Sequence, residues 1–121
     1  MNLNIDIARL APTFDSAAEE WWHKYGTLLL TDRLGEGIAL TQYHAFTLHL
    51  PGGSYTPDFL HITSDGRMLI VEVKGSTKQR NYRDARSKLR AAAELYQWAT
   101  FYEAIVTKDG CEKIEEIGRG E

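Results

Sequence analysis

Hydrophobic and polar positions near the start of the chain predict a helix. Ser16 is followed three positions later by Glu19, the spacing of a capping box at a helix N-terminus. Bulky apolar residues then recur at helical spacing and predict its buried stripe: Trp21, Trp22, Tyr25 and Leu28. We expect the helix to run from Ser16 to about Leu30. A weakly structured lead-in over residues 1–14 precedes it, and a connection over residues 31–37 follows.

Three strands are predicted next, over residues 43–50, 56–63 and 68–74. The first alternates between apolar and polar positions, which is typical of a half-buried strand. The other two carry apolar residues on both faces, as strands in the middle of a covered sheet do. The loop between them ends in Gly66, which indicates a three-residue hairpin with this glycine in the left-handed conformation.

A second helix is predicted over residues 81–100. Its apolar stripe has helical spacing: Ala85, Leu89, Ala92, Tyr96 and Ala99. Residues 101–107 read as a further strand, and residues 112–117 as a weaker edge strand. A chain of 121 residues has room for one domain. The order of elements therefore predicts a single α/β domain with helices on both faces of a mixed central sheet.

Three charged residues interrupt the apolar strands. Asp58 opens the second strand, and Glu72 and Lys74 lie near the end of the third. With a three-residue hairpin loop, Asp58 comes directly opposite Glu72, and Lys74 shares their face. A two-residue loop would place Asp58 opposite Val73 and disperse the cluster. We therefore expect the three-residue loop and a charged cluster on one face of the sheet.

Two carboxylates this close repel each other unless a proton or a cation lies between them. Oxygen ligands favour a hard ion such as Mg²⁺ or Mn²⁺. The single cysteine, Cys111, excludes an intramolecular disulfide and argues against a cysteine-based zinc site. The four histidines are scattered without ligand spacing. His61 is expected on the opposite sheet face from Asp58, in a structural role. No organic cofactor is indicated.

The motif Pro57-Asp58 followed, after 13 intervening residues, by Glu72-Val73-Lys74 resembles that of the PD-(D/E)XK nucleases. The "YTPDF" and "VEVKG" segments are most similar to those of small phage and prophage endonucleases and Holliday-junction resolvases. We expect one nuclease domain over residues 1–121, and the resemblance covers about residues 16–107 of it. It implies a restriction-endonuclease-like, three-layer α/β/α core with the order αβββαβ, a divalent metal ion and phosphodiester hydrolysis.

The same resemblance implies roles for individual residues. The metal ligands would be Asp58, Glu72 and the backbone carbonyl of Val73. Lys74 would be the catalytic lysine. Such families also place an acidic residue of the first helix near the metal. Here Glu19 and Glu20 compete, and the spacing from Ser16 favours Glu19. The alternative role for Glu19 is the capping box alone.

Basic residues gather in one segment although the formal net charge of the chain is −3. Residues 74–90 hold seven of the 14 lysines and arginines and one acid: Lys74, Lys78, Arg80, Arg83, Arg86, Lys88 and Arg90, with Asp84. We expect a phosphate-binding surface, in which Arg83, Arg86 and Arg90 share one helix face. Lys88 is expected beside the apolar stripe, and the resemblance to small phage nucleases implies that it contacts the substrate or the site. The alternative is a solvated helix face.

The sequence thus predicts a Mg²⁺-dependent endodeoxyribonuclease, with Mn²⁺ as a substitute, that is selective for branched or junction DNA. Such an enzyme would act in DNA recombination or repair, and junction resolution favours a homodimer. Two alternatives remain: a non-cleaving nucleic-acid-binding module with the nuclease fold, and an RNA-directed nuclease. No apolar run is long enough to span a membrane and no signal peptide is visible, which favours a cytoplasmic protein. The resemblance to small phage and prophage endonucleases implies a phage or prophage origin.

Overall fold

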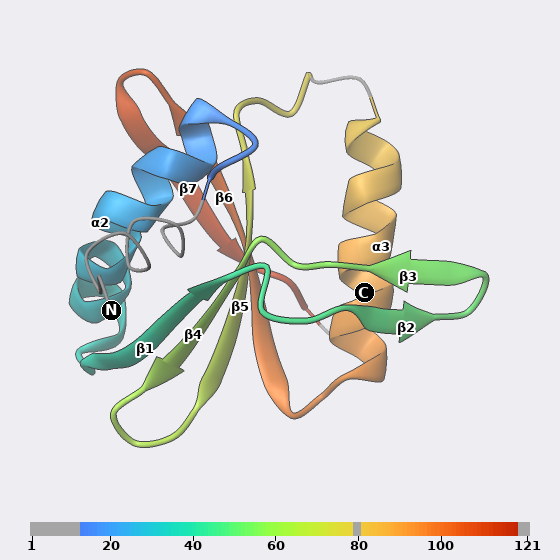
Figure 1. Cartoon of the computed structure of the whole chain (residues 1–121), viewed down its shortest axis with the longest axis horizontal. Coiled ribbons are helices and arrows are strands. Elements are labelled where there is room, and N and C mark those ends of the chain that lie inside the picture. Colours follow the sequence, from blue (N-terminus) through green and yellow to red (C-terminus); the bar gives the residue numbers. More distant parts are fainter. Residues whose placement is uncertain (1–12, 79–80, 119–121) are drawn as a thin grey trace, which may run out of the picture.

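Two helices and seven strands make up the part of the chain that the computed structural model describes, residues 13–78 and 81–118 (Figure 1). In chain order these elements are α2 (Ala17–Leu34), β1 (Ile38–Tyr43), β2 (Leu48–Leu50), β3 (Gly53–Tyr55), β4 (Phe59–Thr63), β5 (Met68–Lys74), α3 (Tyr82–Leu95), β6 (Ala99–Thr107) and β7 (Gly110–Glu116). Arg80, one of the expected DNA contacts, lies outside the described residues.

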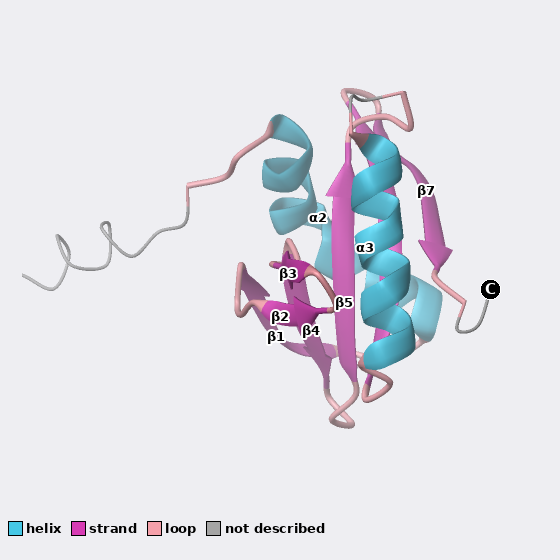
Figure 2. Cartoon of the chain, turned by 90° about the vertical axis from the view of Figure 1, so that its right-hand side faces the viewer, coloured by secondary structure: helices cyan, strands magenta, loops and turns pink. Residues whose placement is uncertain are grey.

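The strands form a five-stranded mixed sheet in the order β1-β4-β5-β6-β7, with β2 and β3 paired separately. Strands β5 and β6 are parallel, and the other neighbours are antiparallel. Helix α2 packs on one face, while α3 and the β2–β3 hairpin cover the other (Figure 2). The predicted α/β class is confirmed. Within the described ranges, no helix is long and apolar enough to cross a membrane.

Helix α2 begins where the sequence predicts. Ser16 has extended backbone angles, and its Oγ accepts a hydrogen bond from the backbone N–H of Glu19 at 3.2 Å. The helix continues past the expected end at Leu30 to Leu34. Gly35 then adopts the left-handed conformation, with φ of 67°, and closes the helix. Residues 31–34 therefore belong to the helix rather than to the predicted connection.

The buried side of α2 differs from the predicted stripe. Tyr25 and Leu28 are 46% and 69% exposed. The residues that face the sheet are instead Glu19, Trp22, Gly26 and Leu30. The indole of Trp22 lies over Gly26, because a Cβ at this glycine would come within 2.4 Å of Trp22 Cε2. The buried position of Trp22 thus depends on the absence of a side chain at Gly26. The predicted stripe, which was built from large apolar residues alone, did not include this glycine.

The predicted strand over residues 43–50 is wrong as a single element. Strand β1 ends at Tyr43, and the chain turns at His44, whose φ is 50°. Strand β2 starts at Leu48 and pairs with β3 across a turn in which Gly52 has φ of 81°. The apolar positions that suggested one strand in the main sheet pack against the core beneath α3. The β2–β3 hairpin is therefore inserted between β1 and β4, and Asp58 follows it directly before β4.

The register between β4 and β5 is the predicted one. Phe59 pairs with Val71, and the ladder runs back to a three-residue loop in which Gly66 has φ of 92°. The backbone N–H of Thr63 donates to the carbonyl of Arg67 at 2.9 Å. One step beyond the paired residues, Asp58 lies opposite Glu72, so the expectation of a three-residue loop is confirmed.

Helix α3 is shorter than predicted, because it ends at Leu95 and the following strand already begins at Ala99. Tyr96 caps the helix through its N–H to the carbonyl of Ala92 at 2.8 Å. No glycine or proline marks this end in the sequence. Strand β7 forms the expected edge and extends the sheet beyond the predicted core boundary at residue 107.

A buried histidine links α2 to the sheet. Trp22 Nε1–H donates to His61 Nε2 at 3.0 Å, and His61 Nδ1 lies 2.8 Å from Thr41 Oγ1. Because an indole N–H can only donate, Nε2 is the acceptor and the ring proton is on Nδ1. Burial lowers the pKa of His61 from 6.5 to about 4. The expected structural role on the face opposite Asp58 agrees with these contacts.

Replacing His61 by glutamine should remove an acid-sensitive component of stability. Its folded pKa lies below the unfolded value, so the neutral ring contributes fully above pH 6.5 and its contribution is lost as pH falls toward 4. The shift corresponds to about 3 kcal/mol. Urea unfolding of wild type and His61→Gln between these pH values should show a gap in unfolding free energy that shrinks as pH falls. The exposed His49, replaced in the same way, is the control, and a constant gap for His61→Gln would contradict the assignment.

Gly26→Ala should destabilise the protein although alanine favours helices. The gain in helix propensity is about 1 kcal/mol, whereas overpacking against Trp22 costs about 1–3 kcal/mol. We expect a lower free energy of unfolding, measured by urea titration. Leu28→Ala, on the exposed side of the same helix, should change stability by about 0.5 kcal/mol or less. An unchanged or more stable Gly26→Ala protein would show that the indole can move aside.

Candidate active site

The carboxylates of Asp58 and Glu72 meet at the end of the β4–β5 ladder. Asp58 Oδ2 accepts a hydrogen bond from the backbone N–H of Val73 at 2.8 Å. Glu72 Oε1 in turn lies 3.3 Å from the backbone nitrogen of Asp58, which donates to it. Each carboxylate is thus tied to the backbone of the opposite strand. This reciprocal pairing fixes both side chains at the positions that the sequence predicted for them.

Two further groups hold Glu72. The hydroxyl of Tyr55 donates to Glu72 Oε1 at 3.0 Å, and Lys74 Nζ lies 3.4 Å from Glu72 Oε2. Burial and the neighbouring carboxylates raise the pKa of Tyr55 well above its usual value, so its hydroxyl stays a donor. Tyr55 belongs to the "YTPDF" segment, but no sequence pattern indicated that its side chain would contact Glu72.

Asp58 is held in an environment that opposes its negative charge. Its side chain is 14% exposed. Burial raises its pKa first, and the charges of Glu72 and Glu19 raise it further, while the Val73 N–H acts in the opposite direction. A carboxyl group in this position takes up a proton or needs a cation beside it. The structure therefore supplies the electrostatic condition for a cation site.

Of the two glutamates in the first turn of α2, only Glu19 points toward this region. Its residue is buried, and its carboxylate accepts hydrogen bonds from Tyr43 Oη and Ser16 Oγ, both at 2.8 Å. The side chain of Glu20 is 57% exposed and lies 3.9 Å from Lys24. The geometry thus favours Glu19, as the spacing from Ser16 did. Glu19 also takes part in the helix cap, which was the alternative role for it, and its role as a metal ligand stays a prediction.

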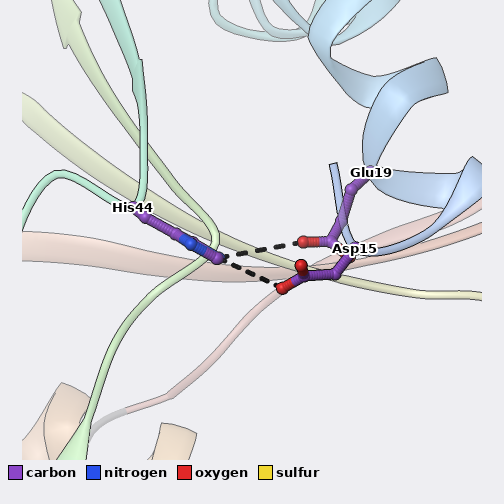
Figure 3. Close-up of side chains that lie close together, drawn as sticks. All are labelled: Asp15, Glu19 and His44. Atoms are coloured by element: carbon purple, nitrogen blue, oxygen red, sulfur yellow. Dashed lines mark ion pairs between the residues drawn. The ribbon is translucent and has the colours of Figure 1, made fainter. Parts of the chain in front are cut away.

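His44 joins this site although its sequence spacing gave no hint of a ligand. Its Nε2 atom lies 3.9 Å from Glu19 Oε1 and 4.0 Å from Asp15 Oδ2 (Figure 3). The same atom lies 3.8 Å from Asp58 Oδ1. Asp15, Glu19 and His44 offer ligand atoms that all lie within 4.8 Å of one another, an arrangement that could hold a metal ion. We call these three residues the His44 cluster. The sequence shows no ligand spacing around His44, because Asp15 and Glu19 lie in a segment that only the fold brings beside it.

A pocket of about 390 Å³ opens beside Glu72 on the α3 side of the sheet. Tyr55, Asp84 and Lys88 line it together with Glu72. Lys88 is exposed and borders this pocket, and its contact with a substrate stays a prediction. A neighbouring hollow, lined in part by Lys78 and Arg83, shares Asp84 with this pocket. Basic side chains thus border the approach to Glu72.

Arg86 departs from the predicted basic face. Its Nη1 donates to Glu103 Oε1 at 2.8 Å, and its Nη2 donates to Glu115 Oε1 at 2.6 Å. The side chain is 18% exposed, whereas Arg83 and Arg90 are exposed residues. The expectation that the three arginines share one open face is corrected, because α3 lays Arg86 against acidic residues of β6 and β7. Arg86 ties the helix to the sheet.

Comparisons of the chain with protein-family models, with curated proteins and with solved structures found no match. What the protein does must therefore be inferred from the chemistry of these side chains.

Asp58→Asn should stabilise the metal-free protein. The folded pKa of Asp58 lies above its unfolded value, so its cost to stability is absent below about pH 4 and grows as pH rises. Asparagine removes the charge but can still accept the Val73 N–H bond. In EDTA at about pH 7.5, we expect a gain of about 1 kcal/mol or more in the free energy of unfolding.

The same variant should lose any stabilisation that Mg²⁺ or Mn²⁺ gives to the wild type, as followed by thermal unfolding. Asp109→Asn, in an exposed turn, is the control and should behave like the wild type. A less stable Asp58→Asn protein in EDTA would contradict the electrostatic account of the site.

Proposed function

We propose that the protein is a divalent-metal-dependent endonuclease that hydrolyses DNA phosphodiester bonds, with selectivity for branched or junction DNA. The observation that carries this proposal is the pairing of Asp58 with Glu72 across β4 and β5, with Lys74 Nζ 3.4 Å from Glu72. The resemblance of the sequence motif to the PD-(D/E)XK nucleases supports the same reading. So does the chain order, because α2, β1, β4, β5, α3 and β6 follow the αβββαβ pattern, with β2 and β3 as an insertion.

The donor atoms fit a hard divalent cation. Asp58 and Glu72 offer carboxylate oxygens at one place. Among the described residues, the ion-pair partners of these two carboxylates are Lys74, which lies beside Glu72, and His44, which lies beside Asp58. Mg²⁺ would be held by Asp58, Glu72 and the Val73 carbonyl, with Glu19 on the side of α2, and Mn²⁺ would substitute. Such an ion activates water and stabilises negative charge on a phosphate.

The side chains around these oxygens have separate tasks in the proposed reaction. Tyr55 and the backbone N–H groups of Asp58 and Val73 keep the two carboxylates oriented. The Lys74 side chain is 22% exposed, so its ammonium group can reach both Glu72 and a bound phosphate. There it would orient the attacking water or stabilise the charge that builds up on phosphate oxygens.

The nucleic-acid side of the proposal depends on basic residues near the pocket. Lys78, Arg83, Lys88 and Arg90 are exposed, and three of them border the hollows beside Glu72. Together they would bind backbone phosphates, and affinity would fall steeply as salt rises. A domain of this size leaves little surface for reading a long base sequence, which favours recognition by DNA shape. Paired cuts in a junction would be made by a twofold homodimer.

Two alternatives use the same surface. A binding module that does not cleave would keep the basic residues but has no need for Asp58, Glu72 and Lys74. An RNA-directed nuclease would use the same carboxylates, since a metal site of this kind acts on the phosphate and does not read the sugar. Matched DNA and RNA substrates separate this second alternative from the proposal.

The decisive experiment compares wild type with Glu72→Gln on a four-way junction, a flap, a duplex and a single strand. Glutamine keeps the size of the side chain and an acceptor for Tyr55, but removes the charge. We expect metal-dependent paired cuts in the junction that vanish in EDTA, and a loss of about a hundredfold or more in cleavage by the variant with DNA binding retained. Glu20→Gln, at an exposed position of α2, should cleave like the wild type.

Equal cleavage of all four substrates would retain the metal chemistry and reject junction selectivity. Binding without cleavage by the wild type, with either metal, would favour the non-cleaving module. Wild-type cleavage rates in Glu72→Gln would contradict the proposed site.

A further inference from the structure

A separate pocket adjoins the proposed nuclease centre on the α2 side of the sheet, and we call it the α2 pocket. It has a volume of about 530 Å³ and lies between the start of α2 and the turn that joins β6 to β7. Figure 1 shows both segments at the end of the sheet where β5 finishes. The lining includes Gly75, which directly follows Lys74, and Ser16, whose Oγ donates to Glu19 Oε2 at 2.8 Å. The pocket is therefore bounded by neighbours of the proposed centre on two sides.

The lining of the α2 pocket is mostly apolar. Trp21 and Val106 supply apolar surface, and Lys108 brings a positive charge to its border. The pocket on the α3 side differs, because the charged side chains of Asp84 and Lys88 line it. Charged groups suit backbone phosphates, whereas a nucleobase presents a flat aromatic ring that suits an apolar wall. The two pockets therefore fit different parts of a nucleotide.

Trp21 is placed to stack against a base. Its side chain is half-buried, and its ring packs on Tyr25 with centroids 5.0 Å apart. It also packs against the core under α2, and a Cβ at Gly110 would lie 3.7 Å from its Cζ2 atom. The indole is thus held between α2 and the β6–β7 turn while part of its surface lines the pocket. A ring that is ordered before binding stacks at little cost in entropy.

Lys108 is available for a phosphate at the border of this pocket. It is exposed in the turn after β6, and none of the ion pairs among the described residues involves it. Its ammonium group can therefore bind a phosphate without leaving a protein partner. Because Gly75 lines the pocket, a DNA strand whose scissile phosphate lies at Lys74 passes the pocket with its next nucleotide.

A base can enter such a pocket only when it has left the base stack. Taking a base out of a duplex costs free energy, and the cost is smallest for a base that is already unpaired. At a branch point the stack of the duplex is interrupted, so bases there are the easiest to take out. A base pocket beside the cleavage centre would therefore select branched or bulged DNA without reading a long sequence.

We propose that the α2 pocket binds one unpaired nucleobase of the cleaved DNA strand, next to the scissile phosphate, with Trp21 as the stacking surface and Lys108 as a contact to the adjoining backbone phosphate. Trp21 is then a specificity-determining residue for branched substrates. The place of the scissile phosphate rests on the proposed function, whereas binding of the base does not require cleavage.

The test measures DNA binding in EDTA, so that it does not depend on cleavage. Fluorescence anisotropy gives the affinity of the full chain for three DNAs of equal length: a paired duplex, the same duplex with a bulged adenine, and that bulge with an abasic site in place of the adenine. The last two share backbone and flexibility, so the ratio of their affinities reports on the base alone. We expect the wild type to bind the bulged adenine about tenfold or more tightly than the abasic DNA.

Trp21→Leu should remove this preference and leave the affinity for the paired duplex within about twofold of the wild type. Leucine keeps an apolar side chain at the position but cannot stack on a base. Trp98→Leu is the matched control, because Trp98 is 51% exposed and precedes β6 at the opposite end of the sheet. It should retain the full preference for the bulged adenine.

Two further variants separate stacking from folding and from charge. Ala17→Leu, at an exposed position that lines the pocket, narrows the pocket and keeps Trp21. It should lower the preference for the base, and it decides the matter if Trp21→Leu does not fold. Lys108→Gln should weaken the binding of all three DNAs alike and reduce the salt slope of affinity by about 1, because a phosphate contact does not read the base.

Equal wild-type affinities for the bulged and abasic DNAs would overturn the base pocket and leave the Asp58–Glu72 centre intact. So would an unchanged preference in folded Trp21→Leu, or in Ala17→Leu where Trp21→Leu does not fold. A preference that depends on Trp21, in a protein that cleaves no DNA with either metal, would support the pocket and reject the nuclease. A wild-type protein that binds none of the three DNAs would overturn the pocket and the proposed function together.

Discussion

The pairing of β4 with β5 is the constraint on which the site depends, because it forces Asp58 and Glu72 together. The side chains of a strand pair alternate between two faces, so a shift of one residue would have separated them. Gly66, in the left-handed conformation, fixes the loop length that sets this register. The cost of two adjacent carboxylates is offset in part by Tyr55, Lys74 and two backbone N–H groups. The remaining imbalance makes the place suitable for a cation.

The packing of α2 extends this site beyond the strand pair. Glu19 and Trp22 lie on the same side of the helix, and Trp22 is fixed between Gly26 and the hydrogen bond to His61. Contacts in the core under α2 thereby determine where the Glu19 carboxylate lies, on the same end of the sheet as Asp58. The neutral state of His61 matters for this reason, since a second ring proton would break the bond that Trp22 donates.

What the sequence could predict follows from how local each interaction is. The β4–β5 register depends on a three-residue loop, and the predicted charged cluster followed from it. The position of His44 beside Glu19 and Asp58 could not be predicted, because it depends on a turn between β1 and the β2–β3 hairpin that the alternating pattern did not indicate. Arg86 was misplaced because its partners, Glu103 and Glu115, lie 17 and 29 residues further along the chain. The two predicted helix ends were wrong for different reasons. Gly35, which ends α2, is visible in the sequence but lies beyond the expected end at Leu30, whereas no glycine or proline marks the end of α3.

The contrast between Glu72 and Glu103 argues for a functional role of the first. The two residues are in register on the parallel strands β5 and β6, and both are buried, at 6% and 3% exposure. Glu103 is fully engaged by the Tyr82 hydroxyl at 2.7 Å and by the Arg86 guanidinium at 2.8 Å. Glu72, one strand away, faces Asp58, a lysine and an open pocket. Glu72 has comparable partners in the Tyr55 hydroxyl at 3.0 Å and Lys74 at 3.4 Å, so the difference between the two glutamates is the neighbouring Asp58 carboxylate. That Glu72 is instead left beside a second carboxylate, where a solvent-borne cation can reach it, is what a metal site requires and what stability alone would not favour.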